Sequence, residues 1–369
     1  MLKNIVIVLI VFILLSAIAV TLFMHQKSFG KLPEGERLER IHQSPHYQNG
    51  EFTNLMPTKL STSDKSRVRI FWEFLFDKIP HLIPSQPLPS VKTNLKTLSQ
   101  ERDFYVWFGH SSYLLQIDGK RFLIDPVLVA GSPLSFVNKM FAGSNVYSPE
   151  DIPEIDYMII THDHWDHLDY EAVTALKNKV GKVITSLGVG SHLEYWGYPK
   201  DKIIELDWNE DIALENDLKL TALPARHFSG RGLTGNQTLW SSFMLQTPRQ
   251  NIYIGGDSGY GDHYKNIAAR YPEIDLAIME NGQYNEAWAN IHILPDQLVT
   301  AIRELNPRKL ISVHNSKFAL AKHSWKEPME LIAKHAEQHH FNLFTPMIGE
   351  VFYFNEEGQH FSKWWETME

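Results

Sequence analysis

The chain has 369 residues, 43% of them hydrophobic, and a formal net charge of −8. This length exceeds one average domain, so we expect one large α/β domain with extensions. The acidic balance argues against nucleic-acid binding, which normally leaves a basic footprint. Because the chain has no cysteine, disulfides and thiolate metal sites are excluded, and any metal ion must be held by His, Asp or Glu.

The first segment, residues 1–25, contains an uncharged and almost wholly apolar run over residues 4–24. This run is about as long as a membrane-spanning helix. Two interpretations fit it: an uncleaved anchor, or a secretory signal cut after Ala17-Ile18-Ala19, which has the small-x-small pattern. Because the apolar run continues past that point, we favour a single-pass membrane anchor whose side is open. Export after cleavage is the alternative.

We divide the remaining chain into an N-terminal extension (26–100), a catalytic domain (101–355) and a C-terminal tail (356–369). The extension is rich in proline, and Val68–Ile79 has the apolar spacing of a short amphipathic helix. We expect the extension to wrap around the catalytic domain. For Gly30–Ser63 a disordered linker is the alternative.

The catalytic domain opens with a predicted hairpin, in which the tight-turn pair Asp118-Gly119 joins two apolar runs. Strands are predicted at 104–107, 113–117, 121–124, 156–160, 182–185, 203–206, 218–223, 242–245, 252–255, 276–279 and 310–313, and helices at 170–179, 189–196, 294–305 and 325–339. Helices alternate with strands, but hairpins are present too. A purely parallel, doubly wound sheet therefore fits poorly.

One short loop concentrates the chemistry of the chain. Directly after the predicted buried strand at 156–160 stands a His-x-His-x-Asp-His motif, formed by His162, His164, Asp166 and His167. Neutral imidazole and carboxylate are the usual ligands of zinc and similar divalent ions. A solvated, His-rich surface loop is the bland alternative. Three histidines and one aspartate at this spacing, at the end of a buried strand, favour a metal site.

Three further candidate ligands, His227, Asp257 and His314, each follow a predicted strand. Strand ends that converge on one edge are where such folds place their chemistry. We therefore expect one ion on His162, His164 and His227, a second on Asp166, His167 and His314, and Asp257 as a carboxylate between them. Both sites keep an open position, which is typical of catalytic rather than structural zinc.

These seven residues, in this order and at about these spacings, resemble the metallo-β-lactamase superfamily. The resemblance implies an αββα four-layer sandwich, with two β-sheets packed together, helices outside and a dinuclear site at one edge. Finer motifs resemble the N-acyl-phosphatidylethanolamine-hydrolysing phospholipase D group over about residues 102 to 350. They include Trp107–Ser112, Phe122–Pro126 and Gly256–Tyr260.

The chain departs from that group at two places. Asn315-Ser316-Lys317 follows the last predicted metal histidine, where the vertebrate enzymes have Trp-Gly-Thr. The segment Met279–Tyr284 is also more polar than its counterpart. These departures concern lipid specificity rather than metal binding.

The resemblance also suggests roles around the metals. His292 matches a histidine near the substrate phosphate and would assist the leaving alcohol, although a surface histidine is the alternative. Asp166 would orient the attacking water. Asp125 would hold a metal-binding histidine through its ring N–H, and His110 would hydrogen-bond near the site or buttress a loop. Four aromatic residues would line an acyl groove or else fill the core: Phe228, Trp240, Tyr284 and Trp288.

The implied function is a hydrolase with two divalent ions, expected to be Zn²⁺, that cleaves a phosphodiester through a hydroxide shared by the ions. The favoured substrate is N-acyl-phosphatidylethanolamine or a related phospholipid. One alternative is a hydrolase of a small phosphorylated lactone or cyclic phosphodiester. The other is a non-enzymatic, membrane-tethered metal-binding protein. No nucleic-acid partner is expected, and a homodimer is kept open by analogy with relatives.

Overall fold

The computed structural model describes residues 2–66, 78–134 and 138–368, together with Arg69, Trp72 and Phe76. The helix predicted over Val68–Ile79 therefore falls largely outside the described residues.

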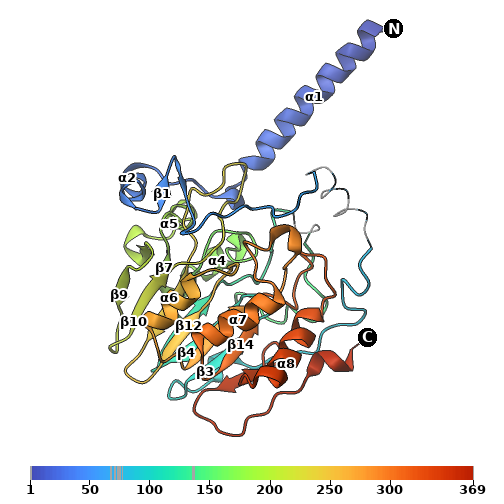
Figure 1. Cartoon of the computed structure of the whole chain (residues 1–369). Coiled ribbons are helices and arrows are strands. Elements are labelled where there is room, and N and C mark those ends of the chain that lie inside the picture. Colours follow the sequence, from blue (N-terminus) through green and yellow to red (C-terminus); the bar gives the residue numbers. More distant parts are fainter. Residues whose placement is uncertain are drawn as a thin grey trace.

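The catalytic domain is built on two seven-stranded sheets (Figure 1). The first has the order β16-β3-β4-β5-β6-β7-β8 and the second the order β15-β14-β13-β12-β11-β10-β9. Strands β5 to β8 run parallel, as do β12 to β15, and the other pairs are antiparallel. The first sheet comprises β3 (Phe104–Trp107), β4 (Tyr113–Ile117), β5 (Lys120–Ile124), β6 (Ile155–Ile160), β7 (Val180–Ser186), β8 (Ile203–Leu206) and β16 (Val351–Tyr353). The second comprises β9 (Asp211–Ala213), β10 (Lys219–Leu223), β11 (Ser242–Gln246), β12 (Asn251–Ile254), β13 (Leu276–Glu280), β14 (Leu310–Val313) and β15 (Leu343–Phe344).

Alternation along the strands divides the hydrophobic core into layers. In β4, Tyr113 and Leu115 belong to the core between the sheets, whereas Leu114 faces the outer helices. In β12, Ile252 points inward and Tyr253 outward. Successive side chains of a strand point to opposite faces, so each sheet buries both of its faces.

Helices cover the outer faces of both sheets. The first sheet packs against α4 (Tyr170–Leu176) and α5 (Gly190–Tyr195), and the second against α6 (His263–Arg270), α7 (Pro295–Leu305) and α8 (Glu327–His339). This arrangement confirms the predicted αββα sandwich. The sequence patterns missed α6 and the short strands β9, β15 and β16. The three strands have only two or three residues each, too few to show a clear period.

The N-terminal extension is packed against the catalytic domain. It forms α2 (Gly35–Gln43), β1 (Tyr47–Gln48) and β2 (Glu51–Phe52). Ile41 and Phe52 share a buried cluster with Trp208 and Trp240. The disordered-linker interpretation of Gly30–Ser63 does not hold, since these apolar side chains gain burial by packing.

Helix α1 (Leu2–Met24) projects away from the rest of the chain (Figure 1). Within Lys3–Met24 the most apolar stretch of 18 residues has a mean hydropathy of 3.3 and no buried residue. The helix is therefore long and apolar enough to cross a membrane. Since a signal sequence near an N-terminus has the same properties, both interpretations of this segment stand.

The C-terminal tail contributes to the main core. A 3₁₀ turn over Trp364–Thr367 buries Trp364 and Trp365, and both join the cluster between the sheets beside Trp325 and Phe352. The tail therefore completes one end of the sandwich.

We expect Trp365→Ala to lower the free energy of unfolding by about 3–5 kcal/mol, as large buried aromatic residues do when truncated. Urea denaturation of the detergent-solubilised full chain measures the change. The neighbouring exposed Glu366→Ala is the matched control and should have little effect. Equal effects of the two substitutions would contradict a core role for the tail.

Candidate metal centre

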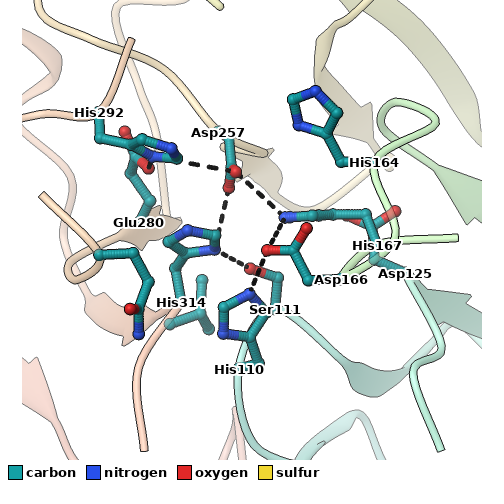
Figure 2. Close-up of polar contacts among 12 residues, drawn as sticks. His110, Ser111, Asp125, His164, Asp166, His167, Asp257, Glu280, His292 and His314 are labelled. Atoms are coloured by element: carbon teal, nitrogen blue, oxygen red, sulfur yellow. Dashed lines mark hydrogen bonds and ion pairs between the residues drawn. The ribbon is translucent and has the colours of Figure 1, made fainter. Parts of the chain in front are cut away.

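The seven predicted ligands meet where strands of both sheets end. Figure 2 shows His164, Asp166, His167, Asp257 and His314 among them. His162 to His167 follow β6 in the first sheet, and His227, Asp257 and His314 come after β10, β12 and β14 in the second. The chain turns sharply there: His110, Asp125 and His314 have φ of 54°, 40° and 67°. Left-handed backbone is costly for such residues and is found mainly where surrounding structure enforces it, often at functional sites.

Three imidazoles form the first cluster. His164 Nδ1 lies 2.9 Å from His162 Nε2 and 3.1 Å from His227 Nε2. All three ligand atoms are close enough to hold one ion. His162 and His227 are buried, whereas His164 is partly exposed.

The hydrogen bonds around this cluster fix which ring nitrogens carry protons. The Thr161 hydroxyl donates to Asp125 Oδ2 at 2.7 Å, so its oxygen accepts from His162 Nδ1 at 3.0 Å. His227 Nδ1 donates to the carbonyl of Ile291 at 2.7 Å. In the neutral rings both Nε2 atoms are therefore bare and face His164 Nδ1. Three nitrogens with at most one proton among them suit a shared cation.

The second cluster holds Asp166, His167, His314 and also His110. Asp166 Oδ2 lies 2.9 Å from His110 Nε2 and 3.7 Å from His167 Nε2. His167 Nδ1 donates to Asp125 Oδ2 at 2.7 Å, which leaves His167 Nε2 free to face the site. Ser111 Oγ lies 3.0 Å from His314 Nδ1.

Asp257 approaches rings of both clusters, and Figure 2 shows its contacts with His167, His292 and His314. Its Oδ2 is 3.1 Å from His167 Nε2, 3.7 Å from His227 Nε2 and 3.9 Å from His162 Nε2. Its Oδ1 is 3.1 Å from His314 Nδ1. One buried carboxylate thus contacts rings of both clusters.

Two buried ring nitrogens of the centre, His164 Nε2 and His314 Nε2, have no hydrogen-bond partner among the described residues. His167 Nε2 and Asp257 Oδ1 make no hydrogen bond there either, and have only the ion-pair contacts given above. Buried polar atoms are nearly always paired, because leaving one unpaired costs about 1–3 kcal/mol. An all-nitrogen and oxygen donor set with unpaired, bare atoms fits divalent metal ions.

Burial sets the charge state of most of these rings. It holds the pKa of His162, His227 and His314 well below the ordinary histidine value, so these imidazoles are neutral, as metal ligands must be. Burial acts the same way on His167, but Asp257, Asp125 and Asp166 outweigh it and raise its pKa. When no metal ion is bound, these carboxylates therefore favour the protonated form of the His167 ring.

Sequence reasoning missed Glu280 at the end of β13. Its Oε2 accepts from His292 Nδ1 at 2.9 Å, and its Oε1 accepts from the backbone of Ser258 and Ile293 at 2.9 and 3.0 Å. Burial raises the pKa of Glu280 to about 7 against the opposing effect of His292. The signal in the sequence was an acidic residue ending a strand next to the one that carries Asp257.

Two predicted neighbours of the metals lie at the centre. Asp125 accepts from His167, as described, and His110 is fully buried with its ring 4.1 Å from that of His314. His292 Nδ1 lies 3.9 Å from Asp257 Oδ2, and the residue is partly exposed.

The four predicted groove aromatics have different positions. Phe228 is partly exposed and its ring lies 4.3 Å from that of His164. Trp288 is partly exposed and donates to the carbonyl of Gln283. Tyr284 is buried and donates to Glu327 Oε1.

The groove prediction is wrong for Trp240. Its ring is 1% exposed and packs in the cluster of Ile41 and Phe52, and its Nε1 donates to Asn54 and Ala225. An indole that fills a core and satisfies its own N–H there is not available to an acyl chain.

Comparison with known proteins agrees with this geometry. The family profile of the β-lactamase superfamily domain matches residues 120–315. An uncharacterised protein of Mycobacterium tuberculosis is 38% identical over 314 residues, which is 84% of each chain. The N-acyl-phosphatidylethanolamine-hydrolyzing phospholipase D 1 of Caenorhabditis elegans is 32% identical over 228 residues, or 57% of this chain and 63% of that one.

Among solved structures, the fold is similar to that of Igni18, a metallo hydrolase from Ignicoccus hospitalis. The TM-score is 0.54 at 19% identity, covering 69% of this chain and 99% of that one. The two sheets carry a His/Asp cluster at their common edge, the family profile matches, and the mycobacterial relative is similar over most of its length. The chain therefore belongs to the metallo-β-lactamase superfamily, as a metal-dependent hydrolase.

Proposed function

We propose that this protein is a phosphodiesterase of the phospholipase D type that hydrolyses N-acyl-phosphatidylethanolamine or a related phospholipid. The observation that carries the proposal is the pair of ligand clusters on either side of Asp257, each with bare, buried donor atoms. Such paired sites suit hydrolysis of phosphate esters.

The proposal assigns His162, His164 and His227 to one ion, Asp166, His167 and His314 to a second, and Asp257 to both. Zn²⁺ is the proposed metal, because imidazole and carboxylate without thiolate still match its preferences. Two bound ions would supply an activated water and neutralise charge that develops on the phosphoryl oxygens.

The chain's own residues supply proton handling. Glu280 accepts from Nδ1 of His292. Burial lowers the pKa of His292, but Glu280 outweighs it and raises the pKa, so the protonated ring would donate a proton from its other nitrogen. Cleavage of the bond between phosphorus and the ethanolamine oxygen leaves an alkoxide that needs this proton. Asp166, held by His110, would accept a hydrogen bond from the attacking water.

The phospholipid assignment rests on three supports. A relative with 32% identity is named as an N-acyl-phosphatidylethanolamine-hydrolyzing enzyme, although the match spans only 63% of its length. Helix α1, used as a single-pass anchor, would keep the centre beside its lipid substrate. Phe228, next to His164, offers an apolar contact for an acyl chain.

The activity test uses the zinc-loaded full chain in mixed micelles. N-acyl-phosphatidylethanolamine, phosphatidylcholine and bis(p-nitrophenyl) phosphate are offered separately, and the His164→Ala, Asp257→Asn double variant serves as control. We expect wild type alone to release N-acylethanolamine and phosphatidate. Cleavage of the small diester only would remove the lipid from the proposal. No turnover of any substrate by protein that holds two ions would contradict a phosphodiesterase altogether.

Metal content provides a second prediction. Elemental analysis of the purified chain should give about two divalent ions per molecule, and His164→Ala should retain about one, since it removes one of three ligands of the first cluster. A single ion in wild type, or two in the variant, would contradict the assignment.

The orientation of His167 by Asp125 yields a third prediction. Asp125→Asn should weaken metal affinity by about 10–100-fold, because a neutral amide oxygen accepts from the His167 ring N–H more weakly than a carboxylate and makes the ring a poorer ligand. Competition with a chromogenic chelator measures the affinity. Asp156→Asn is the matched control: Asp156 pairs with Lys120 and the Arg121 backbone, away from the centre, and its substitution should leave the affinity unchanged.

A further inference from the structure

The segment that follows α1, Lys27–Lys31, is fastened to the loop that carries the His-x-His-x-Asp-His motif. The buried guanidinium of Arg231 makes the connection. Its Nε and Nη2 donate to the carbonyl of Ser28 at 3.1 and 2.8 Å, and its Nη1 donates to the carbonyls of Asp163 and Leu168 at 2.9 and 2.7 Å. One charged side chain thus joins the segment that follows the apolar helix to Asp163 and Leu168, near the two ends of the motif loop.

Two further contacts fix the same segment. Trp196 Nε1 donates to the carbonyl of Lys27 at 2.7 Å, and the backbone N–H of Lys31 donates to His192 Nδ1 at 3.0 Å. The other nitrogen of His192 lies 3.1 Å from Asp163 Oδ2. Between them Gly30 has φ of 77°, and a Cβ there would overlap the His192 ring. This close approach requires glycine.

A column of aromatic rings runs from the last turn of α1 to the motif. Phe23 packs edge-on against Phe29 at 5.2 Å, and Phe29 packs edge-on against Trp165 at 5.0 Å. The Arg231 guanidinium lies 3.9 Å from the centre of the Trp165 ring. Trp165 stands between His164 and Asp166, so the column ends inside the proposed metal-binding loop.

The loop after His227 also reaches the end of α1. The Met24 methyl lies 3.2 Å from the position of a Cβ at Gly232. The next residue, Leu233, is 89% exposed. If α1 crosses a bilayer, Leu233 lies at the level where the helix leaves it, and lipid rather than water would cover the side chain.

This side of the centre is open. His164, Trp165, Asp166 and Phe228 are partly exposed, whereas the ligands behind them are buried. A substrate that approaches the proposed metals from this side therefore passes Trp165, which contacts Phe29 just after the C-terminal end of α1.

We propose that Phe29, Trp165, Gly232 and Leu233 form a lipid-facing surface that seats the open side of the centre on the bilayer spanned by α1. The substrate is then a phospholipid of the same membrane, drawn from the leaflet beside the anchor. This inference rests on the proposed function for the identity of the substrate, but the surface itself is testable without activity.

The structural test uses the absence of native cysteine, which makes labelling site-specific. Full-length Leu233→Cys carries a bimane fluorophore in phosphatidylcholine vesicles that contain doxyl-labelled lipid. We expect its fluorescence to fall at least about twofold, as for interfacial side chains. Asn216→Cys, an exposed position in the turn between β9 and β10, is the matched control and should keep its fluorescence. This turn precedes β10, whereas His227 follows the other end of the same strand.

Phe29→Ala in the Leu233→Cys background should lose about half of the quenching, because it breaks the aromatic column. Equal quenching at positions 233 and 216, or none at 233, would overturn the proposed surface. If the protein is recovered only in soluble form and its chain begins at Val20, the first segment has been cleaved as a signal and the proposed surface is overturned as well.

The functional test compares N-acyl-phosphatidylethanolamine in the protein's own vesicles with the same lipid in separate vesicles. We expect hydrolysis at least about tenfold faster in the shared bilayer, since tethering raises the effective concentration. Phe29→Ala should reduce this ratio several-fold and leave bis(p-nitrophenyl) phosphate turnover within about twofold. A ratio near one would overturn the proposal. Quenching at Leu233 without any lipid hydrolysis would keep the surface and remove the proposed substrate.

Discussion

The crowding of histidine nitrogens around Asp257 is the constraint on which the rest of the structure depends. Bare nitrogens of His162 and His227 both face His164 within about 3 Å, in a region closed to water on most sides. Such an arrangement is unfavourable unless a cation occupies it. The chain holds three of these rings in place through the nitrogen that faces away from the centre. His162 bonds Thr161, His167 bonds Asp125, and His227 bonds the Ile291 carbonyl.

That rigidity comes from the two-sheet architecture. Each ligand stands at or just beyond the end of a strand whose residues are buried on both faces, so the positions of the strand ends are set by three layers of core. The backbone adopts left-handed conformations at His110, Asp125 and His314 to turn their side chains inward. The packing of the sandwich offsets the cost of these conformations.

The N-terminal extension ties the site to the rest of the chain. Asn54 bonds both the N–H and the carbonyl of His227, and Arg231 bonds Ser28 and the motif loop. A helix that is long and apolar enough to cross a membrane is thus coupled to the loops that carry the proposed ligands. The proposed lipid-facing surface and the geometry of the candidate ligands depend on the same short segments of chain.

The sequence by itself determined most of the strands and brought the seven candidate ligands to notice, because strand periodicity, the spacing of the motif and the position of a residue after a strand are local properties. The sandwich itself was implied by the resemblance of these residues to the metallo-β-lactamase superfamily. Only the tertiary structure decided that Glu280 holds His292, that Trp240 belongs to a core cluster, and that Arg231 joins Ser28 to the motif. These contacts link segments far apart in the sequence, and their partners are selected by packing between layers, which leaves no period in the sequence. The aromatic residues show most clearly what the sequence pattern could not decide. Phe228 and Trp240 lie in the same loop between β10 and β11, yet Phe228 contacts His164 at the centre and Trp240 is buried in a separate core cluster.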